Sequence, residues 1–293
     1  MKKFTNVVLI IAMVCVIIGV ICCGVGIAMG GTFGEIKQMI QDGHYSWDWV
    51  GWNDNDDEVS IENQTTYYDS AEIQNLSISI NAGTLDIKQG DGDKIQVDVQ
   101  TDGGRVAVTQ EADTLFVEDK TKSMLGNQHI EITLYLPEKV SFDNVDIDVD
   151  AGEVISDYDG LDCKELTLNV DAGHMSIRNV KASDTAEISV GAGKIEIAAI
   201  EVKDLNMDTG VGQMEITGSV TGDVVADCGV GALDLALSNK EQDFNYEIDC
   251  GLGEIKVGSN NFSGFDGTKS MDNDASQDME IDGGVGSIKV TFK

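Results

Sequence analysis

Proline, arginine and aromatic residues are scarce in this chain. Its 293 residues include a single proline, Pro137, and aromatic residues make up only 6%. The two arginines, Arg105 and Arg178, lie far apart in the sequence. Because arginine is the usual residue for bidentate recognition of phosphate and carboxylate, this scarcity argues against a clustered anion-binding site. Glycine, aspartate, valine and isoleucine dominate instead, as expected of short strands separated by turns.

Recognisable catalytic patterns are also missing. The three histidines, His44, His129 and His174, lie in neither a Ser/His/Asp nor an HExxH context, and the six cysteines form no CxxC pair. Polysaccharide-cleaving β-helices usually pair acidic residues with Arg, Lys or His in a groove, and this chain is short of Arg and His. We therefore predict no catalytic residues, no enzyme activity and no cofactor, and we expect His174 to be a surface side chain.

Positive charge is in short supply too. The chain has 52 acidic residues against 19 basic ones, which gives a formal net charge of −33. Such a charge repels nucleic acid and anionic surfaces, so no nucleic-acid partner is expected. The same charge favours solubility, cation binding and basic partners.

The chain does contain a repeated sequence motif. In each copy, apolar residues alternate with other residues up to a small residue and a glycine, and the alternation resumes after the glycine. LTLNVDAGHMSI (166–177) is a clear example. A repeat with steps of about 20 residues is typical of a stacked, quasi-one-dimensional β architecture. The shared glycines of the eight copies are Gly83, Gly152, Gly173, Gly193, Gly212, Gly231, Gly253 and Gly286.

Each repeat predicts two short strands joined at a glycine corner. Alternation with period two marks a strand with one buried face. In the example, Leu166, Leu168, Val170 and Ala172 are expected to point inward before Gly173, and Met175 and Ile177 after it. The alternation slips by one residue at the glycine, and a glycine with positive φ can absorb that slip. The fold class predicted is all-β, a single-stack β-solenoid of about eight coils.

The residues beside the shared glycine change along the chain. The residue just before it is alanine in the first four repeats. We interpret the larger residues of the later repeats as a core that widens beside the corner. These larger residues are Val211, Val230, Leu252 and Val285.

Two cysteines occupy a core position of the repeat. Cys228 and Cys250 both lie three residues before a shared glycine, where other repeats carry valine. They are predicted to point inward from adjacent coils, about 4.8 Å apart. Two alternatives stay open: small buried thiols, or a disulfide if the compartment is oxidising.

An acidic row is the candidate metal site. The outward position four residues before the shared glycine is Asp208, Asp227 and Asp249 in three repeats that follow one another, and Asp282 in the last. In-register stacking would place the first three carboxylates on consecutive coils, about 5 Å apart, where they repel one another. Either they extend into solvent or calcium bridges them, since calcium is bound by carboxylate and carbonyl oxygens.

The N-terminus carries a long uncharged stretch. Residues 7–31 contain no charged side chain, a length that spans a bilayer as a helix. Lys2 and Lys3 precede it, so residues 1–6 are expected in the cytoplasm and the rest of the chain outside the cell. A cleaved signal peptide and a lipid anchor at Cys22 or Cys23 are the alternatives.

The domain organisation follows from these features. Residues 1–6 form a short cytoplasmic tail and residues 7–31 a transmembrane helix. Residues 32–69 form a juxtamembrane linker that is rich in tryptophan and then in acidic residues. Residues 70–142 begin the solenoid with less regular strands, and residues 143–293 hold the regular repeats, of which the last is expected to cap the stack.

The residues from 130 onward carry a family resemblance. IEITLYLPEKVSFDNVDIDVDAGEVIS (130–156), followed by the Ala-Gly repeats, resembles the bacterial "putative adhesin" β-strand-repeat family, over roughly residues 70–293. With the N-terminal apolar stretch, the layout is similar to LiaG-type envelope proteins of Gram-positive bacteria. The resemblance implies a surface-exposed β-solenoid connected with the cell envelope or its stress response, and it supplies no catalytic residues.

The function expected is a non-catalytic scaffold or binding module, anchored to the cell membrane by its N-terminal helix. Partners consistent with the charge and location are cell-wall components, cationic peptides or another envelope protein. The alternatives are a polysaccharide-active β-helix enzyme of the cell wall and a calcium-stabilised or self-assembling surface adhesin.

Overall fold

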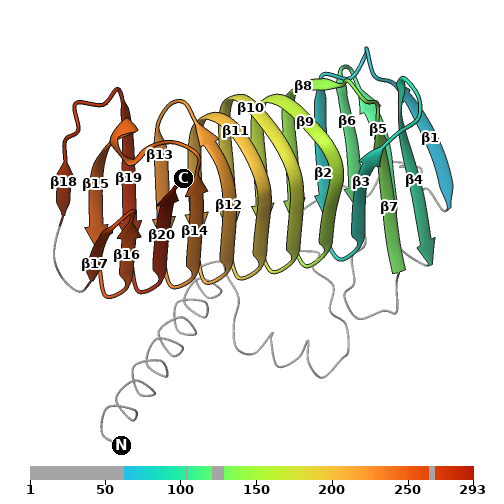
Figure 1. Cartoon of the computed structure of the whole chain (residues 1–293). Helices are drawn as coiled ribbons and strands as arrows, with labels where there is room; N and C mark the ends of the chain where they lie inside the picture. The colour runs from blue at the N-terminus through green and yellow to red at the C-terminus, as the bar shows by residue number, and fades with distance from the viewer. Residues whose placement is uncertain (1–62, 103–104, 121–128, 264–267) are drawn as a thin grey trace, which may run out of the picture. The chain divides into compact units, whose positions relative to one another are not determined.

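The computed structural model describes residues 63–102, 105–120, 129–263 and 268–293 (Figure 1). The expected cytoplasmic tail, the transmembrane helix and most of the juxtamembrane linker lie outside these ranges. Within them, no helix combines the length and the apolar character needed to cross a bilayer. The strands belong to one compact unit, Glu58–Lys293.

The regular elements of the described chain are β-strands, apart from the 3-10 turn η1 (Glu241–Asp243), which confirms the all-β prediction. The strands are β1 (Gln64–Asp69), β2 (Asn75–Ile80), β3 (Thr84–Gln89), β4 (Lys94–Asp102), β5 (Val106–Glu111), β6 (Thr114–Asp119), β7 (His129–Leu136), β8 (Ser141–Val149), β9 (Glu153–Val170), β10 (His174–Val190), β11 (Lys194–Thr209), β12 (Gln213–Val220), β13 (Val224–Cys228), β14 (Ala232–Leu237), β15 (Phe244–Cys250), β16 (Glu254–Val257), β17 (Asn260–Ser263), β18 (Lys269–Met271), β19 (Gln277–Gly283) and β20 (Ser287–Phe292).

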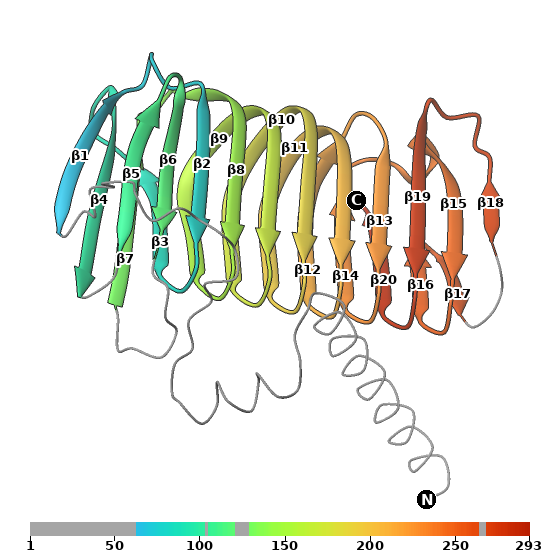
Figure 2. The same cartoon turned by 180° about the vertical axis from the view of Figure 1, so that it is seen from behind.

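The strands wind into a flattened solenoid with two walls (Figures 1 and 2). Wall A has the strand order β5-β6-β2-β8-β9-β10-β11-β13-β19-β15-β18. Wall B has the order β1-β4-β7-β3-β9-β10-β11-β12-β14-β20-β16-β17. The long strands β9, β10 and β11 contribute one half to each wall, because they bend over the edge opposite the glycine corners.

The core lies between the walls and is filled by the inward side chains of each repeat. Leu168, Val170 and Met175 are all buried, as the alternation predicted. Ala172 is exposed, so its expected inward position is wrong. The chain has already begun to turn there, and a period-two rule holds only while the backbone stays extended.

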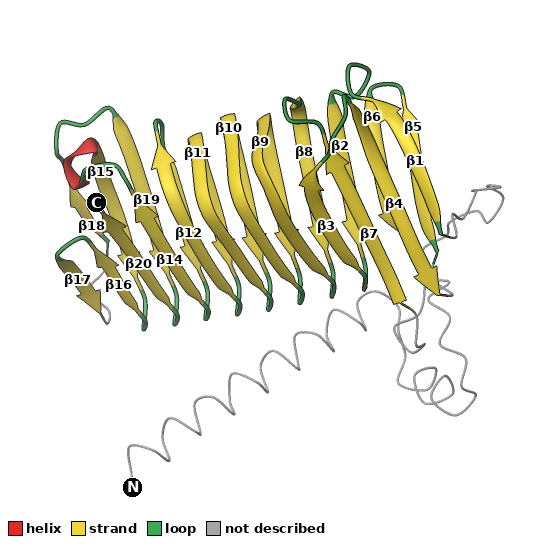
Figure 3. Cartoon of the chain, turned by 45° about the vertical axis from the view of Figure 1, so that its right-hand side comes forward, coloured by secondary structure: helices red, strands yellow, loops and turns green. Residues whose placement is uncertain are grey.

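The shared glycines stack along the lower edge, where Figure 3 shows a row of turns. A Cβ added to Gly152 would lie 2.5 Å from the carbonyl oxygen of Gly83, and one added to Gly173 would collide with the carbonyl of Gly152. These carbonyls accept ladder hydrogen bonds from Glu153 N and His174 N, both at 3.0 Å. The positive φ predicted for the shared glycines is wrong: among the described glycines only Gly160 and Gly258 have it. The glycine is required by the close approach of the neighbouring coil.

The order of coils in space differs from their order in the chain. Strand β19 of the last repeat lies between β13 and β15, and β20 lies between β14 and β16. Likewise the first repeat, β2 and β3, lies between the coil of β6 and β7 and the coil of β8 and β9. The last repeat is therefore inside the stack and not its terminal coil.

Both ends of the stack are closed by antiparallel strands. Strand β4 pairs antiparallel with β7 and β1, and β5 pairs antiparallel with β6. At the other end, β17 and β18 pair antiparallel with β16 and β15. The pairs between these ends are parallel. An uncovered parallel coil would offer a template for adding further strands, and the antiparallel strands occupy that position.

The inserted repeat also separates the two core cysteines. Cys228 and Cys250 both point inward, as predicted, but each pairs with Gly283 and not with the other. They are two coil spacings apart, and none of the three described cysteines, Cys163, Cys228 and Cys250, forms a disulfide. The prediction of adjacent coils is wrong, and so is the disulfide alternative. The reason is the topology, because the repeat that follows Cys228 in space is the last in the chain.

Candidate functional site

Four aspartates form a continuous row on wall A. Asp208 of β11 pairs with Asp227 of β13, Asp227 pairs with Asp282 of β19, and Asp282 pairs with Asp249 of β15. All four side chains are exposed. Neighbouring strands are about 4.8 Å apart, so the row is about 14 Å long. We call these four residues the acidic ladder. The structure brings together the three aspartates predicted from the sequence, but with Asp282 between Asp227 and Asp249.

The electrostatics of the ladder show that its carboxylates repel one another. Partial burial raises the pKa of Asp227, and the charges of Asp282, Asp208 and Glu280 raise it further. Glu280 pairs with Glu247 of the next strand, so a second acidic pair lies beside the ladder. At Asp249 the carboxylate accepts a 3.3 Å hydrogen bond from the Thr268 hydroxyl. The row therefore has a concentrated negative field that a cation would relieve.

A row of exposed apolar residues follows the same four coils. Val211, Val230, Val285 and Leu252 have exposed fractions of 61%, 47%, 54% and 59%. Their order in space follows from backbone hydrogen bonds between successive corners, such as Val230 N to Gly210 O and Val285 N to Gly229 O. The interpretation of these residues as a widening core is wrong, because they precede the glycine at the turn and point outward. We call these four residues the apolar row.

Wall B carries a network of opposite charges. The His174 ring contacts Glu153 at 3.2 Å and Glu196 at 3.0 Å, and Lys194 contacts Glu196 at 2.9 Å and Glu215 at 3.1 Å. The hydrogen bond to Glu196 is the main cause that raises the pKa of His174, and Lys194 lowers the pKa of Glu196. The His174 side chain is 37% exposed, in keeping with the surface position expected from the sequence.

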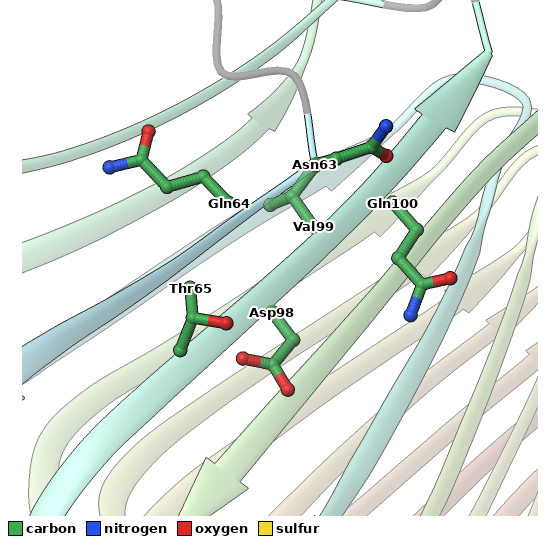
Figure 4. Close-up of a pocket in the computed structure, with 6 residues that line it drawn as sticks. All are labelled: Asn63, Gln64, Thr65, Asp98, Val99 and Gln100. Atoms are coloured by element: carbon green, nitrogen blue, oxygen red, sulfur yellow. The ribbon is translucent and has the colours of Figure 1, made fainter.

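Two surface hollows accompany these features. One, of about 370 Å³, lies on wall B beside this network and includes Arg178, Glu196 and Glu215 in its lining. The other, of about 430 Å³, lies over β1 and β4, where Figure 4 shows Gln64, Thr65 and Asp98 among its lining side chains. Gln96 donates to both carboxylate oxygens of Asp98, at 2.9 and 3.0 Å. The lining of this second hollow is mostly polar.

Metal ligation was the sharpest chemical prediction from the sequence. Among the described residues, no group of three or more His, Cys, Asp or Glu side chains is arranged to hold a metal ion. The ladder spreads its carboxylates along a line, whereas calcium is usually surrounded by six to eight oxygen atoms. The calcium row of Asp208, Asp227 and Asp249 stays a prediction. Its missing member was visible in the sequence, since Asp282 shares the repeat position, but its place in the row was not.

A family model described as "Toastrack DUF4097" matches residues 73–288. No curated protein matches the chain. Among solved structures, a "putative adhesin" from Bacteroides fragilis is 18% identical and covers 79% of this chain and 98% of its own, with a TM-score of 0.40. A "putative adhesin" from Parabacteroides merdae is 14% identical over 78% and 96%, with a TM-score of 0.42. A "putative cell adhesion protein" from Clostridium sporogenes is 13% identical over 79% and 99%, with a TM-score of 0.34.

Proposed function

The chain belongs to the Toastrack DUF4097 family, and on that premise we propose that it is a non-catalytic binding module of the cell envelope. In this proposal the N-terminal apolar segment anchors the chain in the membrane and the solenoid lies outside the cell. The solenoid presents the acidic ladder to a basic partner, such as a cationic peptide or a basic segment of another envelope protein. The membership agrees with the resemblance found in the sequence.

The acidic ladder is the observation that supports this proposal. Partial burial raises the pKa of Asp227, and its two neighbours in the row, Asp282 and Asp208, raise it further, so the free protein holds like charges in a repulsive arrangement. A cationic ligand removes this repulsion and adds attraction, which makes the row a favourable place for positive charge. The net charge of −33 extends the attraction to long range and increases the rate of encounter.

The network on wall B supports a binding role more than catalysis. A polysaccharide-cleaving enzyme needs one carboxyl group with a raised pKa as the general acid. On wall B the pKa of Glu196 is lowered, because Lys194 and His174 bind it in the ionised form. Each of these two basic groups is shared between two carboxylates. This arrangement keeps Glu196 ionised, which is the opposite of what a general acid requires.

The proposal is tested by measuring how a polylysine peptide binds at several salt concentrations. The full-length protein is held in nanodiscs of zwitterionic lipid, with empty nanodiscs as the blank. We expect binding that weakens steeply as salt rises, and about tenfold weaker binding at low salt for Asp227→Asn/Asp282→Asn. The control Asp91→Asn/Asp93→Asn removes the same charge from an exposed loop between β3 and β4 and is expected to bind nearly as well.

Binding without salt dependence, or equal losses of affinity for the two double variants, would show that the ladder is not the binding site.

The location of the solenoid is tested separately on intact cells. An added protease should cleave the solenoid if it lies outside, and protection of the solenoid would contradict that part of the proposal.

Calcium is the second ligand that the ladder could take. Bridging of Asp208, Asp227 and Asp249 through Asp282 would neutralise the same repulsion that a basic partner relieves. Calorimetry with calcium on the full-length protein decides this point. Absence of both a binding isotherm and a rise in melting temperature would eliminate the calcium-stabilised alternative.

A further inference from the structure

We propose that the last four coils bind a cationic amphipathic α-helix laid along the solenoid axis. The apolar side of the helix contacts the apolar row, and its basic side faces the acidic ladder. This inference rests on the proposed function, which requires a basic partner, and goes further by naming the partner's shape and its second point of contact.

The apolar row is an unusual surface. Five large hydrophobic side chains are exposed among the described residues, and four of them are Val211, Val230, Val285 and Leu252. Single exposed apolar side chains are ordinary, but a contiguous row is typical of an interaction site. The backbone does not demand these residues, because Ala151 and Ala172 occupy the same corner position in earlier coils and are also exposed.

The apolar row and the acidic ladder begin in the same coil. In the earlier coils the ladder position is Asp148, Asn169 and Ser189, and the corner position is alanine. From the coil of Gly212 onward every ladder position is aspartate and every corner position is valine or leucine. The core does not explain this joint change, because both positions face solvent. A ligand with one apolar side and one basic side explains both changes together.

The spacing of the rows matches a helix. Successive coils are about 4.8 Å apart, and residues three or four apart in an α-helix rise by about 4.5 to 6 Å along its axis. Residues on one side of an extended strand are about 6.6 Å apart, so a strand would lose register after two coils. The two rows lie three residues apart in each coil, at most about 10 Å, which is close to the width of a helix.

The small size of the apolar row favours a peptide helix over a second copy of this chain. Four partly exposed valine and leucine side chains provide only a few hundred Å², well under the roughly 800 Å² per partner of a standard interface. A second copy would also bring its own ladder of like charge to the contact. A basic helix instead gains from charge complementarity with the ladder.

The test compares two peptides of about 18 residues, long enough to form a helix on binding. Both consist of leucine and lysine in the same numbers. In one the leucines are spaced to form a single side of a helix, and in the other they are scattered around it. With the full-length protein in zwitterionic nanodiscs, we expect the amphipathic peptide to bind at least about tenfold more tightly than the scattered one. Circular dichroism of the complex should show gained helix.

Matched variants locate the contact. Val230→Ser/Val285→Ser removes the centre of the apolar row, and Ala151→Ser/Ala172→Ser makes the equivalent change in the earlier coils. All four side chains are exposed or nearly so, and both variants are expected to melt as the parent does. The valine variant should lose most of the preference for the amphipathic peptide and still bind polylysine, whereas the alanine variant should keep both.

The outcomes separate the two proposals. Equal binding of both leucine–lysine peptides, with polylysine still bound, overturns this inference and leaves the proposed function standing. Failure to bind polylysine overturns the proposed function as well. The parent protein could also self-associate in a way that Val230→Ser/Val285→Ser abolishes. That result would show that a second copy covers the apolar row and would overturn the proposal of a helical partner.

Discussion

The first four glycine coils and the last four share one backbone plan and differ in their side chains. In both halves the shared glycines lie against the carbonyl of the glycine before them in space, except Gly83, which lies against Ile130, and similar backbone hydrogen bonds join successive corners. At the corner position, alanine changes to valine or leucine, and at the ladder position a mixture of aspartate, asparagine and serine changes to aspartate in every coil. The comparison shows that close approach of the next coil requires glycine at the shared position, whereas the outward positions are free to vary.

The inward positions differ as well. Three residues before the shared glycine, the earlier coils carry a regular column of buried aliphatic side chains, Ile80, Val149, Val170 and Val190. The later coils carry Thr209, Cys228, Gly283 and Cys250 in spatial order. These residues are smaller or more polar, so this column buries less apolar surface in the second half. In a stacked architecture, where stability is nearly a sum over neighbouring coils, we expect the later half to be the less stable half.

The largest contrast expected is in cross-linking, which tests the spatial order of the later coils. Asp227→Cys/Asp282→Cys places two cysteines one strand spacing apart, about 4.8 Å, which a disulfide can span. Asp227→Cys/Asp249→Cys places them two spacings apart, about 9.6 Å, which it cannot span. Oxidation followed by mass spectrometry should find the first disulfide and not the second. The reverse result would show that the coils stack in the order in which they occur in the sequence.

The next largest effect concerns the corner glycines. Gly231→Ala would place a Cβ against the carbonyl of Gly212, and we expect a loss of about 3 kcal/mol or more in the free energy of unfolding. Gly229→Ala in the same coil should lose less than about 1 kcal/mol, since Asp150 and Asp171 occupy that position in earlier coils. Urea unfolding measures both. Similar losses for the two variants would show that conformation, and not close approach, selects the shared glycine.

A smaller effect on stability is expected in the inward column, three residues before the shared glycine. Thr209 is completely buried, and its hydroxyl oxygen has no hydrogen-bond partner in the described structure. Thr209→Val should therefore raise the free energy of unfolding by about 1 to 2 kcal/mol. Val190→Thr, one coil away, should lower it by a similar amount. If Thr209→Val lowered the free energy of unfolding, the Thr209 hydroxyl would have to make a hydrogen bond. The expected difference in stability between the earlier and later coils would then be smaller.

The smallest effect is the pH dependence that His174 adds to the earlier half. Its folded-state pKa is raised above the ordinary 6.5, mainly by the hydrogen bond to Glu196. The stability that it contributes is fully present below pH 6.5 and is lost as the pH rises through the folded-state value. Because the side chain is partly exposed, this contribution is a few tenths of a kcal/mol.

Thermal melts of the parent and of His174→Gln between pH 5.5 and 8.5, an interval of about 3 units around that value, measure this effect. The melting temperature of the variant should change less with pH over this interval than that of the parent. Asp227→Asn supplies the contrast from the later half, where removing a repelled charge should stabilise the protein slightly at neutral pH. Parallel pH profiles for the parent and His174→Gln would show that the network on wall B adds no pH-dependent stability.

Local features of the coil were predictable from the sequence. The alternation through Leu168, Val170 and Met175 located both strands of a repeat and their buried side, because every second side chain of a strand faces the same way. The prediction failed where the chain turns. Ala172 and Val211 point outward, since the alternation does not continue through a corner. The reason for the glycine was also missed, because the carbonyl that excludes a Cβ belongs to another coil.

The sequence by itself determined the repeat, the all-β character, the family and the scarcity of basic groups. These follow from local alternation, composition and spacing, which need no knowledge of distant contacts. Only the tertiary structure decided that Asp282 completes the acidic ladder, that Gly283 separates Cys228 from Cys250, and that Val211 belongs to an exposed row. The physical reason is that coils of this kind present nearly identical hydrogen-bonding edges, so any coil can stack on any other. Which coil lies beside which is visible only in the strand pairing, where β19 pairs with both β13 and β15.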